Sequence, residues 1–600
     1  MTMGRTPRAL VILGLLAAAG AAVTAGAPAT LRAPALPGAA QLERQAAEYR
    51  AEQPKTILEL QPFRSTTTVP VRAADGRTGT ATLVNLNPYA NAWYLLTLEF
   101  GATGQGLSYH LENPRPREIA LTLLAGDPTS LRVAIGERGT PCTLWTSRPA
   151  APLDEASRTG LPYAPLCDGR LYLRNPVAGR RTSLERVADF LRDHVWGGEQ
   201  LVGFVKERVY RDAFLEKPVT HEAGAAATRA AMPQAPQPAA IAPDRAGLAI
   251  VPEQLGLDLA APGRELLVGQ WYPVRDLAGV YVSAVTPGTL EPSLLRPGRG
   301  VNALGPVELD ALVYLVAFDL ARFDLHFVLG TDHPRVGWSD RVLPTVRDPA
   351  LPGPDGIDRP APLVVNGMVS PAEAARTVAA FTGGFKRDHG AFRYGALAQV
   401  NHGSHYGFVE QGVVFSKLQP GLATVLALDD GRVELETWTA AGNSRLSGIR
   451  YARQNGVPLV EFDPALGRGV PGALVSNWGA GNWSGSDKGD LRSLRAGVCL
   501  QSNDARRFLI YGYFSDATPS AMARVFEAYG CQYALHLDMN ALEHTYLALY
   551  VTRGKERLVE HLIQGMDVLD QGSGTNYAPR FIGFPDNRDF FYLTRREAPP

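Results

Sequence analysis

A cluster of polar side chains lies within residues 531–546, close to the C-terminal end of the chain. The segment has the pattern of a short strand that ends in polar residues, among them Asn540, Glu543 and His544. Because alternate side chains of a strand share a face, His536 and Asp538 are expected to project together. Carboxylates and imidazoles in this arrangement can transfer protons or bind a polar ligand. A structural interpretation also fits, in which these groups cap nearby backbone.

Three further segments carry residues suited to binding or catalysis. Gly383 and Gly384, followed by Lys386, form a turn in which the backbone can approach an anion or a sugar closely. His405 lies in a Gly-rich loop with a second histidine three residues earlier and can act as an acid or a base. A later loop combines amides, rings and cations that suit a sugar or a phosphate: Asn482, Trp483 and Arg492. The structural alternatives are a helix C-cap, solvated histidines and a surface loop.

The sequence also excludes several classes of function. It contains no Walker A loop, no dinucleotide-binding GxGxxG, no HExxH and no GxSxG. Lys+Arg and Asp+Glu both number 59, so the zero net charge gives no support for a nucleic-acid partner. No cofactor is predicted. One alternative stays open, a divalent metal in a hydrolase whose ligands are of types that suit zinc or manganese: His536, Asp538, Glu543 and His544.

The N-terminus has the pattern of an export signal. Arg5 and Arg8 precede a weakly apolar run that ends in small residues, so residues 1–27 are predicted to be a cleaved signal peptide or, alternatively, an uncleaved anchor. The protein is therefore expected in the periplasm or outside the cell, with membrane contact only through this segment. Export permits disulfides, and the four cysteines fall in two regions, which predicts the pairs Cys142–Cys167 and Cys499–Cys531.

A chain of 600 residues is too long for a single core, so more than one domain is expected. Residues 28–59 are predicted to form an extended or helical stalk, and residues 60–215 a β-rich domain with one late helix. Its strands are short apolar runs between turn residues, at 80–86, 92–100, 121–124 and 131–135. Thr182 and Glu185 have the spacing of a capping box, which predicts a helix over residues 182–196.

Residues 216–250 are rich in Ala and Pro and are predicted to be a linker to a second unit over residues 251–600. In that unit, strands are expected at 312–320 and 325–329. One helix is predicted from Ser370 to Phe381, and another begins at Thr518-Pro519 and ends at Gly530. Each helix would end at glycine just before a polar segment. The predicted fold class is α+β, with a C-terminal mixed α/β domain after the β-rich domain.

The order of these motifs resembles the phosphodiester glycosidase family. This family includes the lysosomal enzyme that uncovers mannose 6-phosphate by removing N-acetylglucosamine, and bacterial proteins linked to exopolysaccharides. Its Asn-Gly-Gly-Phe-Phe motif is similar to residues 382–386, and its Arg-Thr-Ala-Val/Ile-Gly motif to residues 495–499. Its Leu-Asp-Gly-Gly-Gly-Ser motif is similar to residues 537–542, and the strand with Asp that opens the family domain is similar to residues 316–320. The resemblance covers roughly residues 270–570 and excludes the β-rich N-terminal domain.

The chain departs from the family at several motif positions. Thr382 replaces the motif Asn, Lys386 replaces an aromatic residue, and the glycine triplet is replaced by Met539, Asn540 and Ala541. Loss of these glycines is expected to keep backbone away from a ligand. Four residues carry over directly, Gly383, Gly384, Arg495 and Asp538.

The resemblance implies an exported hydrolase that acts on a sugar phosphodiester or an envelope glycan. Asp538 would be the central carboxylate, Arg495 the phosphate partner and Lys386 a second cation. Candidate acids or bases are Glu543, His405 and His544. Candidate contacts to a carbohydrate or sugar-phosphate substrate are Gly383, Gly384, Asn482, Trp483, Arg492 and Asn540. The alternative is a catalytically inactive module of the same fold that binds a glycan or a protein.

Overall fold

The computed structural model describes residues 56–597 with internal gaps, plus the isolated residues 43, 47, 51 and 54. The gaps are 102–105, 125, 136–138, 149, 184, 188–211, 224–233, 262, 299, 340–341, 345–346, 348–349, 354, 387–405, 478–489, 504–505 and 573–575. The predicted signal segment and most of the predicted stalk lie outside the described residues. Among the helices that are described, none is long and apolar enough to cross a membrane.

The described chain is built mainly from antiparallel sheets, so the predicted α+β class with a mixed α/β C-terminal domain is wrong. Helices are few and short: α3 (Pro152–Arg158), α6 (Pro292–Leu295), α7 (Pro306–Asp310), α8 (Pro371–Ala374) and α10 (Pro519–Ala528). The apolar runs of the C-terminal unit are rich in β-branched and aromatic residues, which pack well on a pleated surface. Short buried runs of this kind do not distinguish strand from helix by periodicity, which explains the error.

The N-terminal strands form two sheets around a core of their own. Strands predicted at 80–86, 92–100, 121–124 and 131–135 are confirmed to within two residues. The six-stranded sheet contains, in order, β1 (Ser65–Arg72), β2 (Thr78–Asn85), β3 (Trp93–Phe100), β4 (Gly106–Glu112), β9 (Leu171–Arg174) and β8 (Tyr163–Leu166). The smaller sheet contains β5 (Leu121–Leu124), β6 (Ser130–Ile135) and β7 (Thr140–Thr146). The predicted disulfide Cys142–Cys167 is confirmed, with a Cα–Cα distance of 5.8 Å.

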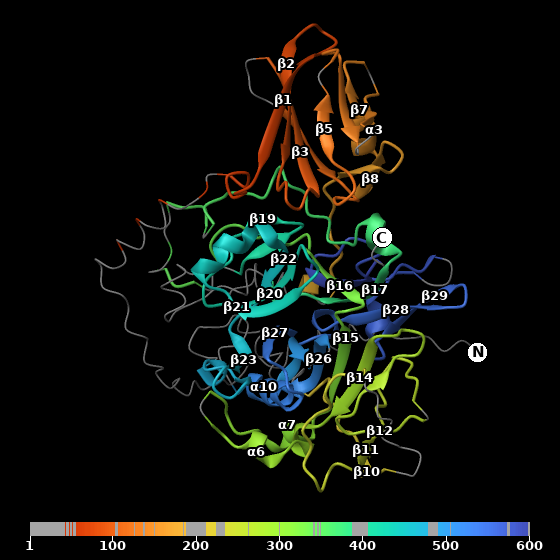
Figure 1. The fold of residues 1–600 in the computed structure, drawn as a ribbon, viewed down its shortest axis with the longest axis vertical. Helices are drawn as coiled ribbons and strands as arrows, with labels where there is room; N and C mark the ends of the chain where they lie inside the picture. The colour runs from red at the N-terminus through yellow and green to blue at the C-terminus, as the bar shows by residue number, and fades with distance from the viewer. Residues whose placement is uncertain are drawn as a thin grey trace, which may run out of the picture. The chain divides into compact units, whose positions relative to one another are not determined.

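Two larger sheets carry the polar segments of the C-terminal unit (Figure 1). The eight-stranded sheet runs β13 (Tyr272–Pro273), β14 (Val280–Val285), β15 (Val313–Asp319), β26 (Arg507–Ala517), β25 (Ser493–Ser502), β27 (Tyr533–Met539), β23 (Pro458–Asp463) and β24 (Arg468–Pro471). A five-stranded sheet runs β16 (Phe323–Val328), β30 (Phe590–Arg595), β17 (Thr377–Thr382), β28 (Leu547–Arg553) and β29 (Glu556–His561). The strands predicted near 312–320 and 325–329 are confirmed as β15 and β16.

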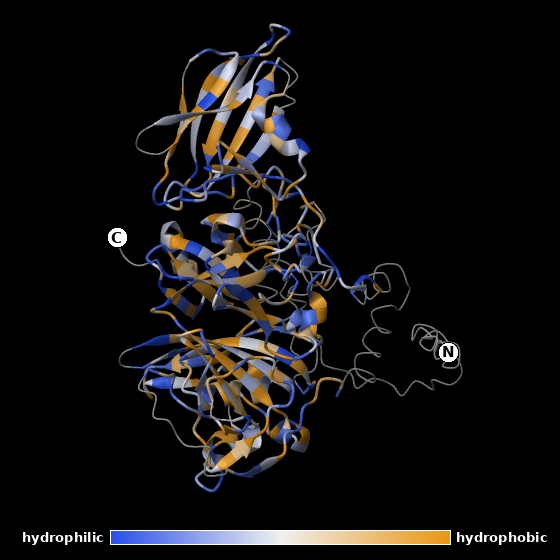
Figure 2. Ribbon diagram, turned by 90° about the vertical axis from the view of Figure 1, so that its right-hand side faces the viewer, coloured by the Kyte–Doolittle hydropathy of each residue, from blue (hydrophilic) through white to orange (hydrophobic). Residues whose placement is uncertain are grey.

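Two further sheets complete the C-terminal unit. One runs β19 (Val413–Ser416), β18 (Phe408–Glu410), β22 (Ile449–Gln454), β20 (Ala423–Leu428) and β21 (Val433–Thr437). The other runs β10 (Thr220–Glu222), β11 (Leu248–Ile250) and β12 (Leu266–Leu267). Short 3-10 turns join some strands: η1 (Pro287–Thr289), η3 (Ala440–Gly448), η4 (Val475–Asn477), η6 (Leu542–His544) and η7 (Met566–Leu569). Figure 2 shows hydrophobic residues concentrated along the strands, where they build the core.

The helix predicted from Ser370 to Phe381 is wrong beyond its first turn. Pro371 and Glu373 do start the helix α8, but it ends at Ala374 and the chain continues as the strand β17. Every residue of β17 is buried, and it pairs with β28 on one side and β30 on the other. Cap residues can nucleate one turn, but burial of an apolar stretch between two strands decides the rest.

The second predicted helix is confirmed as α10. The Thr518 side chain accepts a hydrogen bond from the backbone N–H of Ala521, Pro519 occupies the first turn, and Gly530 follows the helix with φ +69°. The disulfide Cys499–Cys531 is also confirmed, with a Cα–Cα distance of 5.9 Å, and it joins β25 to a residue two positions before β27. This helix and this disulfide therefore set where β27 begins.

The described part of the predicted linker packs against the C-terminal unit. The backbone N–H of Gln237 donates to Gln501 Oε1 at 2.8 Å, and its carbonyl accepts from the indole of Trp271 at 2.9 Å. The domain boundaries drawn from the sequence stay predictions.

Candidate functional site

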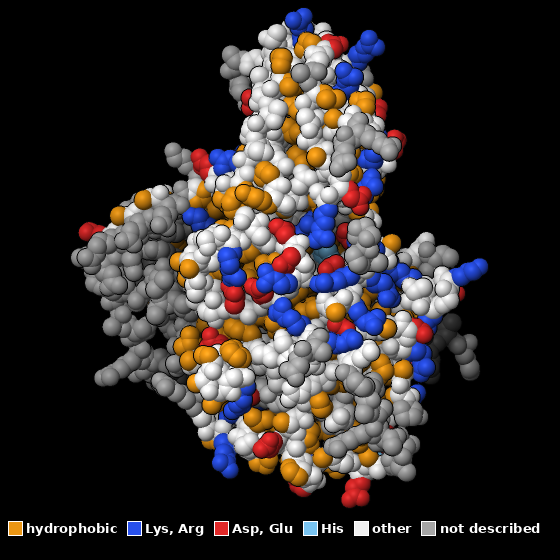
Figure 3. Space-filling model, in the orientation of Figure 1, with side chains coloured by type: hydrophobic (Ala, Val, Ile, Leu, Met, Phe, Trp, Pro, Cys, Tyr) orange, Lys and Arg blue, Asp and Glu red, His pale blue; other side chains and the backbone are white. Residues whose placement is uncertain are grey.

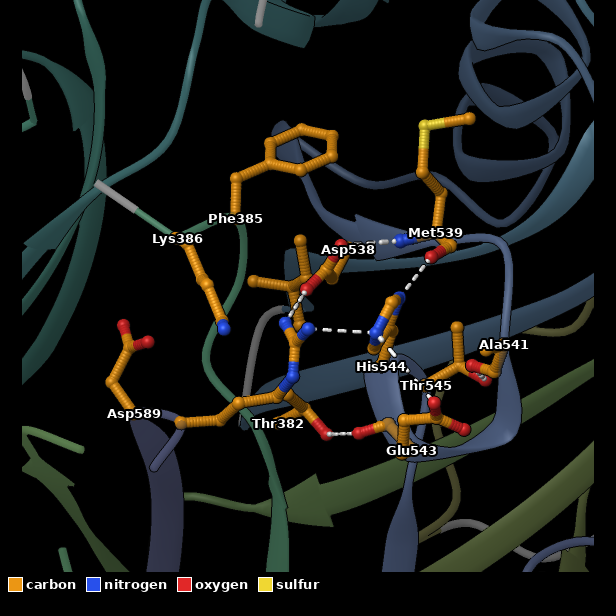
Figure 4. Close-up of polar contacts among 12 residues, drawn as sticks. Thr382, Phe385, Lys386, Asp538, Met539, Ala541, Glu543, His544, Thr545 and Asp589 are labelled. Carbon is orange, nitrogen blue, oxygen red and sulfur yellow. Dashed lines mark hydrogen bonds and ion pairs between the residues drawn. The ribbon is translucent and has the colours of Figure 1, made fainter. Parts of the chain in front are cut away.

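Asp538 lies near the end of β27, in the interior of the C-terminal unit, and is 4% exposed. Its Oδ1 accepts the backbone N–H of Met539 at 2.8 Å (Figure 4). Its Oδ2 pairs with Arg588 Nη1 at 2.8 Å. Burial raises the pKa of this carboxyl to about 6, although Arg588 opposes the shift. Asp538 therefore changes its charge near neutral pH, which an exposed aspartate does not do.

Arg588 connects Asp538 to an imidazole. Its Nη2 lies 2.7 Å from His544 Nε2, and His544 Nδ1 lies 2.6 Å from the carbonyl oxygen of Met539 (Figure 4). Because a guanidinium only donates hydrogen bonds, Nε2 must accept and Nδ1 must carry the proton. The tautomer with its proton on Nδ1 fits both of these contacts of His544.

Glu185 is the second carboxylate on Arg588. Its Oε1 accepts from Arg588 Nη2 at 3.1 Å, from Lys386 Nζ at 2.7 Å and from Asn587 Nδ2 at 3.0 Å. Burial opposes ionisation here, but Arg588 and Lys386 outweigh it and hold the pKa of Glu185 far below its usual range. The pKa values of the two carboxyl groups on one guanidinium are thus shifted in opposite directions, upward for Asp538 and downward for Glu185. This pattern is found where acid and base roles are divided between two carboxyl groups.

Sequence reasoning missed Arg588 and Asn587 and gave Glu185 only a structural role. Thr182 Oγ1 does accept the backbone N–H of Glu185 at 3.1 Å, so half of the predicted capping box is present. The side chain of Glu185 turns to the site instead of back to Thr182. The remainder of the predicted helix, 188–196, lies outside the described residues. Residues 586–589 combine charged side chains of both signs just before an aromatic strand, and this pattern could have identified them from the sequence.

The Gly-Gly turn is built for a close approach to another part of the protein. A Cβ on Gly384, which has φ +137°, would lie 2.6 Å from Arg453 Nη1. Gly383 donates its backbone N–H to the carbonyl of Asp589 at 2.8 Å. The turn follows a strand and not a helix, so the C-cap interpretation is wrong. These contacts fix the direction in which Lys386 leaves the turn (Figure 4).

A buried ion pair, Arg453–Asp589, holds the backbone of this turn in place. Arg453 Nε donates to Asp589 Oδ2 at 2.7 Å, and its Nη2 donates to the carbonyl of Phe385 at 2.6 Å. His333 Nδ1 lies 3.0 Å from Asp589 Oδ1. Burial of Asp589 is more than offset by Arg453 and His333, which hold its pKa below the usual range. The ring of Phe385 packs edge-on against His536, with centroids 4.9 Å apart.

Two other predicted residues, Asn540 and Glu543, follow Asp538 closely in the chain. Asn540 has φ +82°, the left-handed conformation that a glycine would adopt and that asparagine tolerates. Glu543 Oε1 lies 4.0 Å from His544 Nε2 and accepts from Thr182 Oγ1 at 3.4 Å. Of the three substituted glycine positions, only that of Asn540 has positive φ among the described residues, so the backbone path survives the substitutions.

Arg495 is buried opposite Met539 in the β25–β27 register. It donates to the carbonyls of Ala517 at 2.7 Å and Leu491 at 2.8 Å, and burial lowers its pKa to about 9. Within the described contacts, the cation that pairs with Asp538 is therefore Arg588. Arg492 forms ion pairs with Asp516 and, at 3.3 Å, with Asp212. The candidates His405, Asn482 and Trp483 lie outside the described residues.

No group of three or more His, Cys, Asp or Glu side chains in the described part of the chain is arranged to hold a metal ion.

A separate cationic surface lies elsewhere on the C-terminal unit. Figure 3 shows Lys and Arg side chains gathered across the middle of the face in view. The pKa of the half-buried His326 falls to about 3, through burial first and then through the positive charges of Arg450, Arg376 and Arg117. Although the net charge of the chain is zero, its positive side chains are therefore concentrated in one part of the face in view.

Comparisons with known proteins give little guidance. No known family profile and no curated protein matches the chain. One similar solved structure is a crystal structure of a hypothetical protein from Synechocystis, 11% identical, with a TM-score of 0.25 over 89% of this chain and 99% of that chain. The two disulfide pairs are consistent with an exported protein.

Proposed function

We propose that the chain is an exported hydrolase, periplasmic or extracellular, that cleaves a sugar phosphodiester or a related envelope glycan. The observation that carries the proposal is the pair of carboxylates on Arg588. Asp538 has a pKa of about 6, while Glu185 stays ionised beside Lys386. Two carboxyl groups with such different pKa values, with two cations beside them, suit cleavage at an anomeric carbon that carries a phosphate.

Each group takes a role that its chemistry allows. Above about pH 6, Asp538 is ionised and acts as the base or nucleophile at the anomeric carbon. A phosphate leaving group needs little protonation but gains from cations, which Lys386 and Arg588 supply. His544 accepts from Arg588 and so orients the guanidinium.

The test is turnover of a panel of chromogenic sugar phosphodiesters by Asp538→Asn. We expect a loss of at least about 10³-fold in kcat/KM with the fold retained, because the substituted side chain keeps its shape and loses its charge. Asp319→Asn is the matched control, since Asp319 is also buried and ion-paired, with Arg506, and lies remote in sequence on β15. Full activity of Asp538→Asn would exclude the assignment.

A second candidate is a binding module without turnover. It is favoured by the burial of Asp538, whose two oxygens are both engaged, and by the loss of the glycine triplet after it. This candidate predicts retained affinity for an envelope glycan and no turnover of any member of the panel. Binding measured by affinity electrophoresis on the same preparation separates the two functions.

A further inference from the structure

We propose that Glu185 occupies an oxyanion-binding site and keeps it filled until a ligand anion replaces the carboxylate. Three donors of different kinds converge on the single oxygen Oε1: an ammonium, a guanidinium and an amide. Such a set binds one oxygen of a phosphate or a sulfate equally well. The site consists of Lys386, Asn587 and Arg588. No binding role was predicted from the sequence for Asn587 or Arg588.

The position of Glu185 in the chain allows the exchange. Its segment is anchored on the N-terminal side, where Gly179 N–H donates to Thr331 Oγ1 at 2.9 Å and Arg180 N–H donates to the carbonyl of Pro585 at 2.9 Å. On the other side, Val187 is 56% exposed. The carboxylate thus reaches inward from a surface segment, and the exchange requires its side chain to rotate away from the three donors.

Charge balance limits the kind of anion. Lys386 also pairs with Asp332 at 3.0 Å, and Arg588 also pairs with Asp538, so each cation keeps one carboxylate when Glu185 leaves. An incoming anion with a single negative charge restores the original balance, whereas sulfate, or phosphate near pH 7.5, is mainly a dianion and adds one further negative charge beside the two cations. A phosphodiester carries one such charge, and this identification of the natural ligand rests on the proposed function. The proposal of an oxyanion site does not depend on that function.

The experiment is calorimetric titration of inorganic phosphate into the full chain at pH 7.5 and constant ionic strength. Glu185→Ala empties the site without removing a donor, so we expect phosphate to bind at least about tenfold tighter than to the unaltered protein. Phosphate should also raise the Tm of Glu185→Ala more than that of the unaltered protein. Sulfate should compete, because it presents the same tetrahedral oxygens.

Three further variants make the result decisive. Glu185→Gln keeps the bulk and removes the charge, and it should fold even if the alanine variant does not and show an intermediate gain. Adding Lys386→Met to Glu185→Ala should abolish the gain, whereas Glu155→Ala, an exposed glutamate on α3, should change nothing. Equal phosphate affinity with and without Glu185, or a gain that survives Lys386→Met, overturns the proposal. Because the readout is binding, a chain without turnover can still pass, and the two proposals fail separately.

Discussion

Two buried arginines in this protein each bind a pair of carboxylates, and they do so in different surroundings. Arg174 on β9 contacts Glu112 at 2.6 Å and Glu410 at 3.8 Å. Arg588 contacts Asp538 at 2.8 Å and Glu185 at 3.1 Å. In each pair, burial raises the pKa of one carboxyl, to about 7 for Glu410 and about 6 for Asp538.

The difference lies in what else touches each guanidinium. Arg174 lies over the rings of Trp93 at 4.2 Å and Tyr163 at 5.3 Å, and Tyr163 donates its hydroxyl to the carbonyl of Met368 at 2.9 Å. That cluster joins the N-terminal sheets to the C-terminal unit. Arg588 instead has His544 as a neighbour and shares Glu185 with Lys386, groups that can change charge or exchange partners. A raised pKa alone therefore does not mark a functional site, and the surrounding donors decide.

Removal of the structural arginine should give the largest loss of stability. Arg174→Met leaves two buried carboxylates without their cation, and we expect the free energy of unfolding to fall by about 3–5 kcal/mol. Urea unfolding measures the change. If Arg174→Met unfolds like the unaltered protein, the cluster does not hold the two regions together.

The pH dependence of stability should report Glu410. Its folded pKa, about 7, exceeds the ordinary value of 4.5, so its contribution is complete below about pH 4.5 and is lost as pH rises through 7. The loss amounts to up to about 3 kcal/mol. Glu410→Gln should remove this component from unfolding curves measured at pH 5 and pH 8. An unchanged difference between the two curves would assign the effect to another group.

At the other arginine, a conservative change should affect activity more than stability. Arg588→Lys keeps the charge but cannot reach Asp538, Glu185 and His544 together, so we expect kcat/KM to fall by about 10²-fold. The matched change Arg174→Lys should leave kcat/KM unaltered. Equal effects of both changes on turnover would remove the distinction between the clusters.

The pH profile of turnover should report Asp538. Since the reaction requires the ionised carboxylate, kcat/KM should fall about tenfold per pH unit below pH 6 and stay level above it. Initial rates from pH 4.5 to 8 measure this, with Asp319→Asn as the control that keeps the profile. A rate independent of pH across this range would contradict the role of Asp538.

The smallest effect is expected at Asn540. Asn540→Gly relieves the cost of its positive φ and should change the free energy of unfolding by less than about 1 kcal/mol, while Asn540→Ala should destabilise by about 1 kcal/mol. Thermal unfolding measures both. Destabilisation by glycine would show that the asparagine side chain, and not the backbone, is what the position requires.

Several strands (β2, β3, β5, β6, β15 and β16), α10 and both disulfides could be predicted because they depend on local patterns of apolar residues, cap residues and cysteine spacing. The strand β17 could not, because tertiary burial overrode a strong helix start. The sheet order could not either, because it depends on pairings between distant segments. Asp538 and Lys386 were predicted from local motifs. Arg588 was not, since its partners Asp538 and Glu185 lie 50 and 403 residues away and only folding brings them together.

The position of β30 in its sheet has a consequence for the timing of synthesis. It is the last strand of the described chain, yet it lies between β16 and β17, and Arg588 and Asp589 directly precede it. The ribosome makes both partner strands long before this strand can insert between them, and such distant pairings form slowly. During that interval the nascent chain carries Asp538 and Lys386 without Arg588, the residue that joins them through Glu185.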